Sequence, residues 1–245
     1  MLAGSTTWLM AVRTKADGRT FVEGVFEGEG KMTFDDGTVL EGTWQSGSMV
    51  KGKQTRVEDG LLYVGDFKDS LFHGHGMAKS SDQLYEGEWR NGEPCGRGLL
   101  KDSLNGIVYE GEMMGGRPHG RGKETNSRKG HVYEGDLRYG MKEGHGRLTY
   151  TNGSVYEGQF QNDVPEGRGK FTRANGDTYE GEWRRGKQWG KGRLVSENGM
   201  KAHEGHWSDG VLHGEGKEIS LSDGTILREG VWEKGKFTLP PVIAL

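Results

Sequence analysis

One segment of the chain reads Tyr179-Glu180-Gly181-Glu182-Trp183-Arg184-Arg185-Gly186-Lys187-Gln188-Trp189-Gly190-Lys191-Gly192-Arg193. An aromatic residue is followed by Glu and Gly, a large apolar residue stands two positions after that Gly, and a Gly-x-Gly pair completes the segment. The same pattern recurs along nearly all of the 245 residues. Self-similarity at a fixed period is the signature of a repeat architecture, so the period indicates the fold more strongly than any single segment does.

The repeat has a period of about 23 residues and fills positions 21–236. The glycines of its ten anchor dipeptides are Gly24, Gly42, Gly65, Gly87, Gly111, Gly135, Gly158, Gly181, Gly205 and Gly230. The residues two positions after them are all large and apolar: Phe26, Trp44, Phe67, Trp89, Met113, Leu137, Phe160, Trp183, Trp207 and Trp232. A column this regular predicts a shared structural role.

The composition alone would suit a disordered linker, because only 31% of residues are hydrophobic and 45 are glycine. The 7 Trp, 8 Tyr and 8 Phe residues, however, mostly fall at fixed phase, which favours a folded array. The formal net charge of −3 provides no strong field for nucleic acid or an anionic membrane. The single cysteine, Cys95, excludes an internal disulfide and suits a reducing compartment. The apolar run at 8–12 is too short for a secretory signal, so a cytoplasmic protein is predicted.

The turn signals predict an all-β fold. Asn-Gly or Asp-Gly dipeptides such as Asn152-Gly153 separate successive repeats, and these dipeptides favour type I′ hairpin turns. Each repeat then supplies two short antiparallel strands and advances the sheet by roughly 10 Å. We expect an elongated single-sheet meander, with residues 1–20 as an N-terminal cap, 21–236 as the array and 237–245 as a tail.

Strand alternation separates two faces in each repeat. Tyr179, Gly181 and Trp183 share one face, where rings can lie on bare glycine backbone, whereas Glu180 and Glu182 point to the other. These rings could be core alone, but a single layer cannot cover both faces, and exposed aromatic grooves mark partner sites. The predicted partner-binding residues are Phe67, Tyr85, Trp89, Tyr109, Tyr133, Tyr156, Phe160, Tyr179, Trp183 and Trp207.

The repeat resembles the MORN (membrane occupation and recognition nexus) repeat, whose pattern Y-E-G-x-W…G-x-G is clearest in the units that begin at Tyr85, Tyr109, Tyr133, Tyr156 and Tyr179. The resemblance implies hairpin-per-repeat rods with an aromatic-lined groove. Such arrays occur in ciliary axonemes, including radial spoke heads, in cytoskeletal structures and beside some lipid-modifying enzymes. It therefore implies a cytoskeletal or axonemal scaffold that docks partner helices or strands and associates through its open strand edges.

The alternative is a peripheral membrane module that binds anionic lipids through Arg97, Arg121, Arg168 and Lys191, the middle residues of Gly-x-Gly pairs. Glutamates on the neighbouring strand are expected to neutralise much of this basic ladder. No nucleophile–base pair or metal-ligand spacing stands out, since His73, His119 and His213 share a position in repeats that are not adjacent. The sequence predicts no enzyme, no cofactor, no metal and no nucleic-acid partner.

Overall fold

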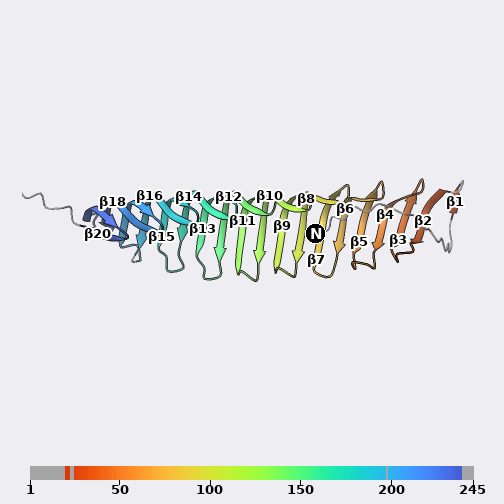
Figure 1. Ribbon diagram of the computed structural model, residues 1–245, viewed down its shortest axis with the longest axis horizontal. Helices are drawn as coiled ribbons and strands as arrows, with labels where there is room; N and C mark the ends of the chain where they lie inside the picture. Colours follow the sequence, from red (N-terminus) through yellow and green to blue (C-terminus); the bar gives the residue numbers. More distant parts are fainter. Residues whose placement is uncertain (1–19, 23–24, 197, 239–245) are drawn as a thin grey trace, which may run out of the picture. The chain divides into compact units, whose positions relative to one another are not determined.

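The computed structural model describes residues 20–22, 25–196 and 198–238 (Figure 1). Contacts divide the chain into two compact units, Met1–Lys129 and Gly130–Leu245. The first contains β1 (Thr20–Val22), β2 (Val25–Thr33), β3 (Val39–Gln45), β4 (Ser48–Thr55), β5 (Leu62–Lys68), β6 (Leu71–Lys79), β7 (Gln83–Arg90), β8 (Glu93–Asp102), β9 (Ile107–Met114) and β10 (Arg117–Asn126). The second contains β11 (His131–Arg138), β12 (Met141–Tyr150), β13 (Val155–Gln161), β14 (Val164–Thr172), β15 (Thr178–Arg184), β16 (Lys187–Ser196), β17 (Lys201–Ser208), β18 (Val211–Ser220), β19 (Ile226–Glu233) and β20 (Lys236–Thr238).

Within each unit every strand pairs antiparallel with the next strand in the chain, so the fold is a meander of hairpins. The predicted all-β class with one hairpin per repeat is confirmed. The described residues include no helix, and hence none that could cross a membrane. The division into cap, array and tail stays a prediction, because most of the cap (1–19) and of the tail (239–245) lies outside the described residues.

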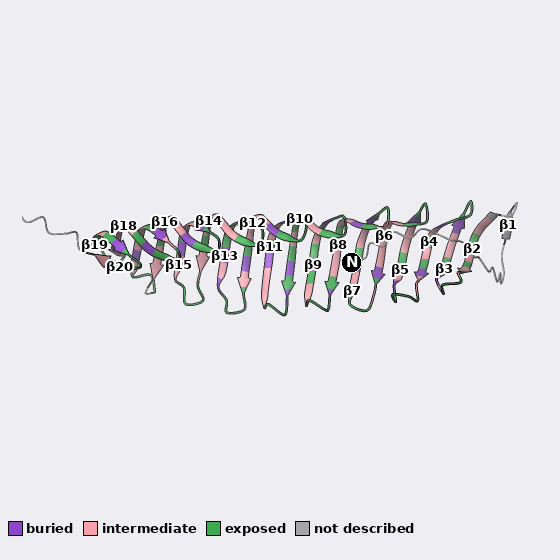
Figure 2. Ribbon diagram, viewed as in Figure 1, coloured by how far each residue is buried: buried purple, intermediate pink, exposed green. Residues whose placement is uncertain are grey.

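The two faces of the strands differ as alternation predicts. In β15, Tyr179 and Trp183 are buried, whereas the intervening Glu180 is exposed. Figure 2 shows the same alternation of buried and exposed positions along many strands. The buried side, which we call the aromatic face, carries the core, and the opposite side, the outer face, is polar.

A row of glycines crosses each unit at one register. In the first unit Gly87 pairs with Gly98 across one hairpin, and Gly98 pairs with Gly111 across the junction to the next repeat. The second unit carries the equivalent row, Gly135, Gly146, Gly158, Gly169, Gly181, Gly192, Gly205, Gly216 and Gly230. The result is a line of backbone without side chains, as the aromatic-over-glycine interpretation requires.

Tyrosine rings cover this bare backbone on the aromatic face. Tyr85 is 0% exposed, and a Cβ added to Gly98 would lie 2.4 Å from its ring. The Tyr85 hydroxyl donates hydrogen bonds to the carbonyl oxygens of Glu88 (3.0 Å) and Cys95 (3.1 Å). The second glycine of Gly-x-Gly is therefore required for close approach of the ring.

The first glycine of the Gly-x-Gly pair, here Gly96, has a different role. Between Gly87↔Gly98 and Glu88↔Cys95 the register shifts, and Gly96 adopts a φ of 55° in this bulge. The bulge frees the amide of Arg97, which donates to the Glu88 carboxylate at 3.0 Å. The glutamate after Glu-Gly thus satisfies a backbone group that the bulge leaves without a strand partner.

The type I′ turn expected at the Asn152-Gly153 junction does not form. Such turns need positive φ at both central residues, yet at the Asn152-Gly153 junction only Gly153 has it. The Asn152 side chain instead accepts a hydrogen bond from the Ser154 amide at 2.9 Å. Both central residues have positive φ in the two-residue turns inside the repeat, as at Asn91 (52°) and Gly92 (83°). The assignment of I′ geometry to the Asn152-Gly153 junction is therefore wrong.

The buried tyrosines of the aromatic face make the stability of the fold sensitive to alkaline pH. Burial, with a smaller effect of nearby Glu112, raises the pKa of Tyr109 to about 12, and burial likewise raises the pKa of Tyr63, Tyr85, Tyr156 and Tyr179. An unfolded tyrosine ionises near pH 10. The stabilising contribution is therefore complete below about pH 10 and is lost as the pH rises toward 12.

We expect the urea midpoint to fall across this interval, while tyrosinate absorbance increases together with unfolding. Tyr109→Phe, which cannot ionise at this position, should reduce the steepness of the fall. If these buried tyrosines all ionised near pH 10 without loss of stability, the prediction would be wrong.

Candidate functional site

The outer face carries two rows of mostly polar side chains, one on each side of the glycine row. In the second unit the first row alternates in charge on every successive strand. Its members pair directly across the strands in the order Glu134, Arg147, Glu157, Lys170, Glu180, Arg193, Glu204, Lys217 and Glu229. The second row lies on the opposite side of the glycines and includes Glu182, Lys191, His206, Glu215 and Val231.

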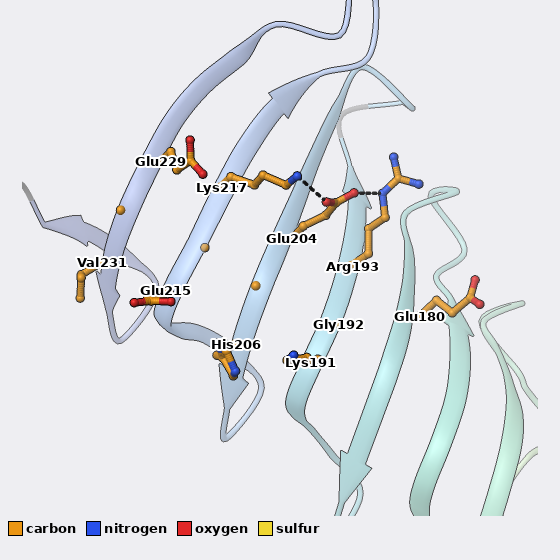
Figure 3. A pocket seen from close by; sticks show the side chains of 13 residues that line it. Glu180, Lys191, Gly192, Arg193, Glu204, His206, Glu215, Lys217, Glu229 and Val231 are labelled. Atoms are coloured by element: carbon orange, nitrogen blue, oxygen red, sulfur yellow. Dashed lines mark ion pairs between the residues drawn. The ribbon is translucent and has the colours of Figure 1, made fainter.

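Ion pairs hold part of the first row in place. Arg193 Nε lies 2.9 Å from Glu204 Oε1, and Lys217 Nζ lies 3.2 Å from Glu204 Oε2. Figure 3 shows both cations directed toward the same carboxylate. Partly exposed pairs of this kind contribute only about 0–1 kcal/mol each, so they chiefly fix where the charges stand.

A groove of about 710 Å³ lies between the two rows in β15–β19. Its floor is the bare backbone of Gly192, Gly205, Gly216 and Gly230. Charged side chains of both signs form its walls, and Val231 stands at the β19 end (Figure 3). The groove can receive a polar segment of another protein, with carboxylates and cations available at alternate strands.

The ten predicted partner-binding aromatics lie on the other face. All of them are buried, with exposed fractions between 0% and 8%. Trp183, for example, packs edge-on against Tyr156 with ring centroids 5.0 Å apart and donates through Nε1 to the Gly169 carbonyl at 3.0 Å. Their role as core is confirmed, whereas their role in partner binding stays a prediction.

The four predicted lipid-binding cations are exposed but do not form an uninterrupted basic ladder. Arg97 and Arg121 belong to the first unit, where Glu112 pairs with Arg97 and accepts a hydrogen bond from the Arg121 amide. Arg168 and Lys191 belong to the second, where Glu182 has the same relation to both. Carboxylates stand between the cations in each unit, as the sequence suggests.

The glycine-floored groove is the feature that sequence reasoning did not locate. The signal was present, since the anchor glycine and the second glycine of Gly-x-Gly align in the strand register. Among the described residues there is no group of three or more His, Cys, Asp or Glu side chains that could hold a metal ion. His73 and His203 each keep a buried Nδ1 without a hydrogen-bond partner.

Consecutive hairpins, a glycine row and a repeating aromatic core define an open all-β repeat protein. The chain belongs to the MORN repeat family. The family model, described as the MORN repeat, matches residues 20–39, 63–83, 85–103, 109–127, 133–155, 156–178, 179–201 and 203–221. The hairpins β3–β4 and β19–β20 fall largely outside those segments but keep the paired glycines and the buried Trp44 and Trp232.

No curated protein matches the chain. Among solved structures, the chain is similar to the TCP domain of SAS-4 (dCPAP) from Drosophila melanogaster, determined in complex with a proline-rich motif of Ana2 (dSTIL). The identity is 11%, the match covers 80% of this chain and 98% of that one, and the TM-score is 0.39. MORN repeats commonly mediate protein–protein or membrane interactions, and proteins built from them are generally non-catalytic scaffolds.

Proposed function

We propose that this protein is a non-catalytic interaction scaffold of a cytoskeletal or ciliary assembly, such as a radial spoke. Helices or strands of partner proteins dock along it, and further copies or partners associate through its open strand edges. The observation that carries the proposal is the outer groove, with its glycine floor and its regular rows of charge. The cellular setting rests on the resemblance to MORN arrays of axonemes and the cytoskeleton.

The charge pattern favours a protein partner over a lipid surface. An anionic membrane attracts clusters of Lys and Arg whose charges are not offset. In the groove the cations Arg193 and Lys217 share Glu204, and Glu182 stands beside Lys191. A protein segment can complement charges of both signs, so mixed rows suit specific docking in a set register.

The test compares two variants with equal changes in net charge. In the first, Glu180→Lys and Glu229→Lys reverse the charge of two residues that line the groove and form no ion pair with another residue that the structure describes. In the second, Asp209→Lys and Glu233→Lys reverse exposed residues outside the groove. Proximity labelling in the native cell should recover axonemal or cytoskeletal proteins with the wild type and the second variant, and lose them with the first.

Vesicle sedimentation provides the opposing outcome. Vesicles of phosphatidylcholine with phosphatidylserine should not sediment the protein at physiological salt. Binding that falls with salt and disappears on Arg168→Glu would overturn the scaffold proposal in favour of a peripheral membrane module. Equal labelling by both charge variants would remove the groove as the docking site.

A further inference from the structure

The aromatic face of the first unit has a gap in its packing beside Tyr85. A pocket of about 330 Å³ lies between β7, β8 and β9, with walls that include Tyr85, Pro94, Leu100 and Met113. The turn Gly115-Gly116 closes one side, and Glu93 and Arg117 stand at its rim. This volume is at the lower end of the range for pockets that bind small molecules.

The preceding repeat shows what fills the equivalent space. There Trp89 packs edge-on against Tyr63 (centroids 5.3 Å apart) and against Phe72 (5.4 Å). Its Nε1 donates to the carbonyl oxygen of Gly76 at 2.9 Å. The same indole-to-glycine bond is formed by Trp44, Trp183 and Trp207. In three of these four cases the indole also packs edge-on against the tyrosine of the previous repeat: Trp89 on Tyr63, Trp183 on Tyr156 and Trp207 on Tyr179.

Two substitutions within the repeat leave the space at Tyr85 underfilled. Met113 pairs with Gly96 in the register at which Trp89 pairs with Gly74, so a methionine stands where the indole would be. Pro94 pairs with Trp89 as Phe72 pairs with Phe67 in the preceding hairpin, so Pro94 occupies the position of Phe72. Neither has a ring of comparable size, and Met113 has no N–H to donate to a carbonyl.

The rim of the pocket is also open, because the turn beside it lacks side chains. Gly115-Gly116 is the one inner turn among the described hairpins that carries no side chain at either central position. A Cβ added to Gly115 would lie 3.8 Å from the Glu93 carboxylate, and one added to Gly116 would lie 3.8 Å from Pro94. Met113 is 5% exposed and lines the pocket together with Tyr85, and its unbranched thioether side chain can shift to contact an entering ring.

We propose that this pocket binds a tryptophan side chain presented by a partner protein, an inference that rests on the proposed scaffold function. The partner's indole stacks among Tyr85, Pro94, Leu100 and Met113 and supplies the N–H that the repeat lacks. Glu93 and Arg117 at the rim contact the polar backbone next to that tryptophan. The occupant is inferred from the protein's own repeats, which place an indole against the equivalent tyrosine three times.

The experiment titrates N-acetyltryptophanamide into the full-length ¹⁵N-labelled protein. We expect saturable chemical-shift changes at the amides of Gly115 and Gly116, and none with N-acetylleucinamide. Met113→Trp fills the pocket from within and should weaken binding at least tenfold. The matched control is Met114→Trp, because Met114 is adjacent but 41% exposed and should leave binding unchanged.

Pro94→Phe restores the ring seen at Phe72 and should also abolish binding, which keeps the test valid if Met113→Trp does not fold. No saturable shift in the wild type, or equal binding by both tryptophan variants, would overturn the proposal. Tighter binding in Trp8→Ala would identify this chain's own Trp8, which lies outside the described residues, as the occupant and overturn docking of a partner. If the titration shows no binding, the groove variants Glu180→Lys and Glu229→Lys still test the scaffold function independently.

Discussion

Trp183→Ala is expected to lower the free energy of unfolding by about 3–5 kcal/mol, the usual cost of removing a buried tryptophan. The ring is 8% exposed and contacts Tyr156 and Tyr179, with centroids 5.0 and 5.4 Å away. It also donates to the carbonyl of Gly169, on the second strand of the preceding repeat. Removing it opens a cavity at a junction between repeats and leaves that contact unmade.

Trp189→Ala is the matched control, because it makes the same substitution in the same hairpin. Trp189 is half-buried, and its main side-chain interaction is with Arg184, whose Cζ lies 4.9 Å from a ring centroid. Its loss should cost only about 1 kcal/mol. Urea unfolding followed by circular dichroism measures both variants. If Trp183→Ala lowers the free energy of unfolding no more than Trp189→Ala does, yet abolishes partner binding, the buried aromatic residues serve as a binding surface more than as a core.

Gly98→Asn is expected to cost about 3 kcal/mol or more. A Cβ at this position would lie 2.4 Å from Cε2 of the Tyr85 ring, and that ring is fully buried. Overpacking a filled site forces neighbours off their preferred conformations and costs about 1–3 kcal/mol, and displacing a buried ring adds to this. The damage should spread to the Tyr85 hydroxyl bonds with the carbonyls of Glu88 and Cys95.

Gly60→Asn separates this steric effect from the backbone effect of losing a glycine. Gly60 has a φ of 67°, and nothing lies within 4 Å of an added Cβ. Asparagine tolerates this left-handed conformation better than most residues, so the cost should be a few tenths of a kcal/mol. Thermal unfolding of both variants gives the comparison. Equal losses would show that chain flexibility, and not ring-on-backbone packing, explains the glycine row.

The sequence specified the strands well because the information lies in short-range periodicity. The spacing of Tyr179, Gly181 and Trp183 assigned them to one face, and burial of Tyr179 and Trp183 confirms it. The same rule assigned Glu180 to the other face, where it pairs with Arg193 across β15 and β16. The type I′ turn predicted at Asn152-Gly153 was wrong, because Asn152 accepts a hydrogen bond from the Ser154 amide, and the dipeptide signal does not distinguish this arrangement from positive φ.

The candidate sites depended on information of a different kind. The outer groove exists because glycines of neighbouring strands fall in one register, and the pocket beside Tyr85 exists because Pro94 and Met113 meet across two hairpins. None of these residues marks a site when its own repeat is considered alone. Only the pairing brings them together.

The amino-acid sequence by itself determined the period, the hairpins and the division into an aromatic and a charged face, since these follow from side-chain alternation along one strand. Tertiary structure alone decided that the rings are almost fully covered and that the open groove lies on the charged face. The physical reason is that accessibility depends on how closely backbones approach, and here tyrosine rings settle onto glycines of the neighbouring strand, so that one sheet buries its own core.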